Sequence, residues 1–168
     1  MTTKQKKEYT FSKIKISSLV RSLLSEIDDQ TIPLFKLWED HALDTLIVTF
    51  NSIRILTPIL ESASKIQFNN NPEQLFGKLN IPEPKISWTM FRHGLSHGIR
   101  PFTVVSGGIR YGWGIKQYKG SHHISTDNLI IISARNLLDD LILYLKKFEF
   151  DNTEIDIQTG VKFVDLPN

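Results

Sequence analysis

The residues best suited to chemistry lie in one short segment, FRHGLSHGIRP, which runs from residue 91 to residue 101. Arg92 stays positive at neutral pH and can hold a phosphate through two hydrogen bonds. His93 and His97 can give or take a proton near neutral pH. These groups suffice to cleave RNA without a metal. An imidazole can help the ribose 2′-hydroxyl attack the phosphorus, while the guanidinium stabilises the more negative transition state.

The same residues also allow interpretations without catalysis. Arg92 can form a surface ion pair, His97 can be a satisfied buried histidine, or the segment can bind phosphate without cleaving it. On a helix, His93 and His97 lie one turn apart, a spacing that can also chelate zinc. The cationic surroundings and the lack of nearby carboxylates oppose a divalent ion. We therefore expect no metal site, and no cofactor is indicated.

The stretch around this segment, residues 85–126, contains no Asp or Glu, although the whole chain carries a net charge of only +2. Its cations are Lys85, Arg92, Arg100, Arg110, Lys116 and Lys119. Charge segregated in this way is a candidate footprint for a polyanion, and a solvated surface loop is the alternative.

Aromatic residues alternate with these cations, as they do in surfaces that bind single-stranded RNA. We expect Trp113 and Tyr111 to offer stacking faces, and packing of the hairpin onto the helices is the alternative that would give the same pattern. Flanking phosphates would be held by Arg100, Arg110 and Lys116. The two remaining histidines of the stretch, His122 and His123, are interpreted as exposed loop residues.

Hydrophobic periodicity and turn signals predict the elements that position this segment. Residues 1–10 look frayed. Helices are expected over 12–29, over about 34–66 with a kink at Pro58, over 87–98, and after an N-cap at Ser133. FTVV and IRYGWGIK around Ser-Gly-Gly predict a hairpin over 102–117. The predicted remainder is a connection at 67–85, a loop at 118–128, a strand at 128–132 and a tail hairpin turning at 158–160.

These elements favour a single domain over residues 1–168, mainly α. The expected fold is an antiparallel four-helix bundle with a small β-hairpin insertion between the last two helices and a short β tail over 150–168. No apolar run approaches the roughly 20 residues that span a bilayer, so no membrane contact is expected. The N-terminal residues do not read as a secretory signal. The absence of cysteine fits a cytoplasmic protein and excludes thiolate chemistry.

The run Arg92-His93-Gly94-Leu95-Ser96-His97 resembles the R-x4-6-H motif of HEPN-domain proteins, where a polar residue follows the arginine. That family folds as a four-helix bundle with the motif near the start of a later helix. Its members often form homodimers in which two motifs face each other, and many are metal-independent endoribonucleases, including toxin–antitoxin proteins.

The resemblance implies that RNA is the partner, that Arg92 and His97 are the catalytic pair, and that His93 assists them. The alternative is a non-catalytic helical module that dimerises and binds a protein partner.

Overall fold

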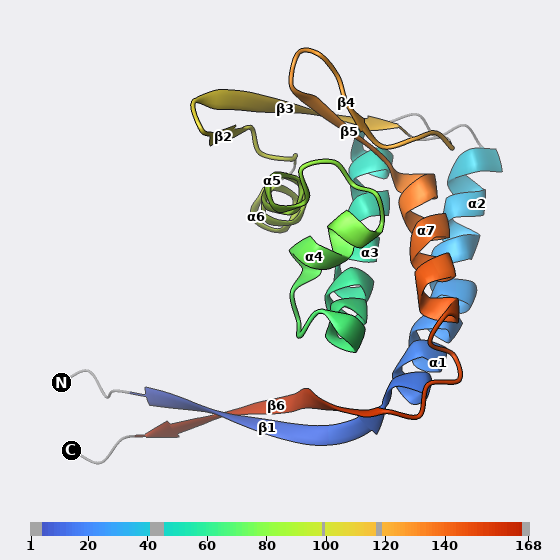
Figure 1. Ribbon diagram of the computed structural model, residues 1–168, viewed down its shortest axis with the longest axis vertical. Helices are drawn as coiled ribbons and strands as arrows, with labels where there is room; N and C mark the ends of the chain where they lie inside the picture. Colours follow the sequence, from blue (N-terminus) through green and yellow to red (C-terminus); the bar gives the residue numbers. More distant parts are fainter. Residues whose placement is uncertain (1–4, 41–45, 99, 117–118, 166–168) are drawn as a thin grey trace.

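The computed structural model describes residues 5–40, 46–98, 100–116 and 119–165 (Figure 1). Helices form its middle, a four-stranded sheet lies across one end of them, and a two-stranded ribbon extends from the other end. Buried apolar side chains from the helices and from strand β5 join in one cluster. No helix in the described ranges is both long and apolar enough to cross a membrane.

The helical segments follow the predicted periodicity in most places. They are α1 (Ile16–Glu26), the π-helical turn η1 (Ile27–Thr31), α2 (Ile32–Asp40), α3 (Leu46–Gln67), α4 (Pro72–Lys78), α5 (Pro84–Trp88), the π-helical turn η2 (Thr89–His93), α6 (Gly94–His97) and α7 (Ala134–Lys146). The helix expected over 34–66 is helical in both described parts, and residues 41–45 lie outside the described residues. Pro58 lies inside α3. Ser133 caps α7 as predicted, because its hydroxyl accepts the N–H of Asn136.

Strands β1 (Gln5–Lys15) and β6 (Glu154–Asp165) form the ribbon, paired antiparallel from Gln5↔Asp165 to Lys15↔Glu154. The prediction of frayed residues is therefore wrong for residues 5–10, and residues 1–4 lie outside the described residues. The predictions of a helix from residue 12 and of a tail hairpin are also wrong. Gly160 makes no turn. A Cβ there would lie 2.7 Å from Thr10 Oγ1, so the glycine allows the strands to approach where their register shifts.

The four-stranded sheet contains the predicted hairpin, made of β2 (Val104–Ser106) and β3 (Ile109–Lys116). Gly107 and Gly108 turn the chain with φ of 57° and 78°, a backbone region that favours glycine. Next in the sheet come β5 (Leu129–Ser133), parallel to β3, and β4 (His123–Ile124), antiparallel to β5. The predicted strand at 128–132 is confirmed, whereas the predicted loop at 118–128 contains β4.

The predicted fold class is wrong. The described residues form six strands in two sheets, so the chain is not a four-helix bundle with a small insertion. The sheet is part of the hydrophobic core rather than an addition to the surface of a helical bundle, because Ile130 and Ile132 of β5 are fully buried against the helices. The sequence analysis did not predict these two sheets, because the β1–β6 and β3–β5 pairs join segments that are not adjacent in the chain.

Candidate nucleic-acid interface

The segment FRHGLSHGIRP begins in a π-helical turn rather than in the predicted regular helix. The carbonyl of Met90, inside η2, accepts the N–H of Phe102 at 2.9 Å. This bond draws the chain after α6 back against the helix. A Cβ on Gly94 would lie 2.5 Å from the Phe102 nitrogen and 2.6 Å from the Pro101 Cα. Gly94 is therefore the residue that lets the two backbones touch.

Arg92 does not point into an open site. Its Nε donates to Oε1 of Glu61 on α3 at 2.9 Å, and the two side chains are 29% and 39% exposed. Glu61 therefore neutralises the positive charge of Arg92, which the sequence analysis expected to bind a phosphate. Glu61 lies 31 residues away from Arg92 in the sequence, so no local pattern indicates the pair.

The rings of His93 and His97 stack, with centroids 6.3 Å apart and planes 15° from parallel. His97 is exposed and His93 is half-buried. This is the one-turn spacing expected on a helix. Within the described ranges, no three His, Asp or Glu side chains are grouped to hold a metal ion.

Arg54 of α3 holds the end of α6 in place. The sequence analysis did not identify this residue. Its Nε donates to the carbonyl of Leu95 at 2.9 Å, its Nη2 to the carbonyl of Gly98 at 3.1 Å, and its Nη1 to Oδ1 of Asn51 at 3.2 Å. A cation at these carbonyls satisfies acceptors that the helix end leaves open. Only the folded contact identifies Arg54, because nothing in its own helix distinguishes it.

Two adjoining hollows follow α6. One is an open pocket of about 480 Å³, lined by Gly98, Arg100, Pro101, Phe102, Thr103 and Trp113. The other is a shallow groove lined by Arg54, Leu95, Ser96, His97 and Gly98. Gly98 belongs to both linings, so the hollows form one surface, which we call the Gly98 surface. Two predicted residues, Arg100 and Trp113, meet here.

The two aromatic side chains of the pocket differ in their exposure to solvent. Phe102 is 43% exposed, whereas Trp113 is half-buried and packs edge-on against Phe50, with ring centroids 5.3 Å apart. Trp113 is therefore a fixed wall, and Phe102 is an accessible ring beside Arg100. Phe102 is one of the aromatic residues that alternate with the cations in the sequence, although only Trp113 and Tyr111 were predicted as binding residues.

The other predicted residues lie on β3 outside this pocket. Arg110 is exposed near the hairpin turn, opposite Val105, and Tyr111 is half-buried and packs against the core. Lys116 lies at the far end of the strand, opposite Ser133. The structure therefore gathers only part of the predicted phosphate-binding set at one place.

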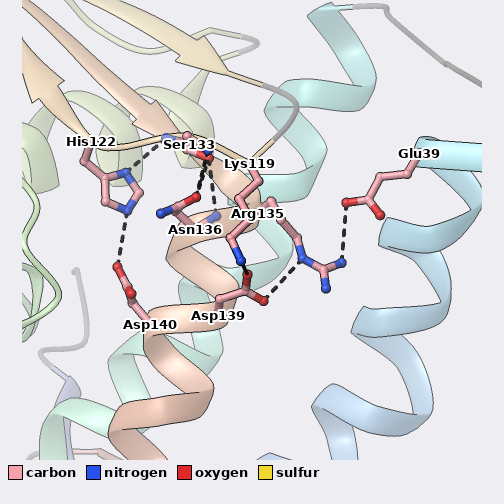
Figure 2. Close-up of polar contacts among 9 residues, drawn as sticks. Glu39, Lys119, His122, Ser133, Arg135, Asn136, Asp139 and Asp140 are labelled. Atoms are coloured by element: carbon pink, nitrogen blue, oxygen red, sulfur yellow. Dashed lines mark hydrogen bonds and ion pairs between the residues drawn. The ribbon is translucent and has the colours of Figure 1, made fainter.

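The interpretation of His122 and His123 as exposed loop residues is wrong, because the His122 side chain is buried and His123 is half-buried in β4. The His122 side chain is 3% exposed, and its Nδ1 accepts the N–H of Ser133 at 3.0 Å (Figure 2). Burial, and to a lesser extent the charge of Lys116, lower the pKa of His122 from 6.5 to about 4. Burial and the charge of Asp139 raise the pKa of Asp140, which faces the ring.

No family model, no curated protein and no solved structure matches this chain.

Proposed function

We propose that the protein binds single-stranded RNA on the Gly98 surface. The observation that carries the proposal is the shared lining of one pocket of about 480 Å³ by a cation, Arg100, and two aromatic residues, Phe102 and Trp113. Such a pocket suits both parts of a nucleotide, because the guanidinium binds the phosphate and an accessible ring stacks on the base.

The groove beside the pocket extends this chemistry. Ser96 and His97 are exposed there, and both can donate hydrogen bonds to phosphate oxygens. A strand that crosses Gly98 contacts the pocket and the groove in succession. Residues 85–126, which supply most of this surface, contain no carboxylate to repel the strand.

Arg100, rather than Arg92, is the phosphate-binding residue of this proposal. Glu61 already neutralises Arg92 at 2.9 Å, and a phosphate would have to displace that carboxylate. No acidic partner competes for Arg100 along the lining of its pocket.

Fluorescence anisotropy with a labelled 12-nucleotide RNA tests the proposal. Loss of one phosphate contact in Arg100→Gln should make the slope of log K against log salt shallower by about 0.7. Phe102→Leu keeps an apolar side chain but removes the ring, so the Kd should rise about 5- to 150-fold, the equivalent of about 1–3 kcal/mol of stacking.

Two matched variants lie away from this surface. Arg21→Gln removes an exposed arginine from α1, and Phe150→Leu removes a phenylalanine ring that is 84% exposed beyond α7. Both should bind RNA like the unmodified protein. The proposal fails if the unmodified protein does not bind, or if the control variants lose as much affinity as the pocket variants. DNA of the same sequence shows whether the 2′-hydroxyl contributes.

Cleavage of the bound RNA is a second candidate, favoured by the stacked imidazoles of His93 and His97 beside the groove. Two adjacent imidazoles can supply a general base and a general acid. The same RNA, incubated with excess EDTA, should then be cut by the unmodified protein and left intact by His97→Ala. Uncut RNA would limit the function to binding. The homodimer and the protein partner named in the sequence analysis remain predictions. Sedimentation equilibrium would test the homodimer.

A further inference from the structure

Residues 119–122 lie along the first turns of α7, where Figure 2 shows Lys119 and His122 facing Asp139 and Asp140. Four contacts join them. The N–H of Gly120 donates to Oδ1 of Asn136 at 2.8 Å, and Lys119 Nζ lies 3.6 Å from Asp139 Oδ2. Nδ1 of His122 accepts the N–H of Ser133, and its Nε2 lies 3.6 Å from Asp140 Oδ2. The Lys119 contact is at the surface, because that side chain is 76% exposed, whereas the His122 side chain is 3% exposed.

This geometry fixes the protonation state of His122. Because Nδ1 accepts an N–H, it carries a lone pair, and the single proton of the neutral ring is on Nε2. Nε2 points toward Oδ2 of Asp140 at 3.6 Å, beyond hydrogen-bond distance, and has no hydrogen-bond partner among the described residues. A second proton would have to be placed on Nδ1, where it would face the N–H of Ser133. Protonation therefore breaks the buried contact.

Each element packed around the His122 ring carries a charged side chain near it. Lys116 of β3 opposes a charged imidazole, and Lys119 lies in the same segment. Asp140 of α7 would favour the charge, but its own carboxylate is disfavoured by burial and by Asp139. Burial of the ring and the N–H of Ser133 favour the neutral imidazole. The neutral form is the one that the folded segment holds.

We propose that His122 is an acid-sensitive latch: protonation of its imidazole releases residues 119–122 from the start of α7. β4 stays paired with β5 through its own ladder, in which His123 lies opposite Ile131 and Ile124 lies opposite Ile130. Opening therefore exposes the first turns of α7, where Asn136 and Asp139 lose their partners in the released segment.

The size of the effect follows from the difference between the two states. In the opened segment the imidazole has its ordinary pKa of about 6.5, and in the closed segment the pKa is about 4. Linkage then raises the opening constant about 30-fold between pH 7.5 and pH 5, because the open state takes up the proton. Below pH 4 the gain levels off at about 300-fold.

Amide hydrogen exchange at Ser133 measures this opening directly, since its N–H is the donor to the ring. After correction for the intrinsic pH dependence of exchange, its protection factor should fall about 30-fold from pH 7.5 to pH 5. His122→Asn keeps an acceptor for Ser133 but cannot titrate, so its protection should be nearly constant. His123→Asn, the neighbouring control, should behave like the unmodified protein. Constant protection in the unmodified protein, or an equal fall in His122→Asn, overturns the latch.

A second measurement needs no variant. The ¹⁵N chemical shifts of the His122 ring should show a proton on Nε2 alone at pH 7, and titration should begin well below pH 6. A ring that titrates near pH 6.5, or that carries its proton on Nδ1, contradicts the proposal. Neither experiment contains RNA, so the latch and the proposed RNA binding fail or succeed separately.

Discussion

Two physical arguments predict opposite effects of Gly94→Ala on the stability of the protein. Gly94 has helical backbone angles, with φ of −60° and ψ of −47°, so intrinsic propensity alone predicts that alanine stabilises the helix by about 1 kcal/mol. The surrounding backbone predicts the reverse. An added Cβ would lie 2.5 Å from the Phe102 nitrogen and 2.8 Å from the Pro101 carbonyl carbon, and neither atom can move as a flexible side chain would.

The expected loss can be estimated from two contributions. Forcing a methyl group into a packed site costs about 1–3 kcal/mol, and displacing Phe102 from the Met90 carbonyl costs about 1 kcal/mol more. After the gain in helix propensity, the free energy of unfolding should fall by about 1–3 kcal/mol. For a chain of this size, each kcal/mol lowers the melting temperature by about 2–4 °C.

Urea unfolding followed by far-UV circular dichroism measures the loss, and Gly77→Ala is the matched control. Gly77 is also a helical glycine, in α4, but its added Cβ would meet only the Pro84 side chain, at 3.2 Å. This control should be close to neutral. If Gly94→Ala is as stable as the unmodified protein or more stable, the close approach of the two backbones is refuted. A destabilised variant should also bind RNA less tightly, because Arg100 and Phe102 follow the displaced chain.

Three further predictions concern other contacts. Arg54→Met removes the donors to the Leu95 and Gly98 carbonyls and should lower the free energy of unfolding by about 2 kcal/mol in urea, whereas Arg54→Lys should restore part of it. Asn71→Ala removes the N-cap of α4 and should cost about 1 kcal/mol, and Asn71→Asp should not. The folded-state pKa of His122, about 4, lies below the ordinary 6.5, so its contribution is complete above pH 6.5 and is lost as the pH falls toward 4. Thermal unfolding should therefore show up to about 3 kcal/mol more acid destabilisation in the unmodified protein than in His122→Asn, and equal acid sensitivity would contradict this assignment.

The sequence predicts the elements whose cause is local. Ser133 caps α7 through its own side chain, and Gly107-Gly108 turns the β2–β3 hairpin through backbone freedom. Both depend on residues within a few positions, which a short pattern contains. The π-helical turn at Thr89–His93 has no such signal in the sequence, and it changes how the segment before α6 is held.

The elements that the sequence misses depend on distant partners. Residues 5–15, QKKEYTFSKIK, look like a polar terminus until β6 pairs with them. Arg92 looks like a free cation until Glu61 folds against it, and the exposed histidine expected at 122 is buried by the first turns of α7. Each of these facts is set by tertiary packing, which overrides local preference.

The β1–β6 ribbon also constrains how the chain is made. β1 leaves the ribosome before its partner β6, which begins 139 residues after β1 ends. At about 5–20 residues per second, β1 waits roughly 7–30 s for its partner. Throughout that interval Tyr9 and Phe11, which stay more than half exposed even in the finished ribbon, have no opposite strand. The ribbon therefore cannot close until β6 has been made, and translation speed determines how long the unpaired aromatic strand is open to other chains.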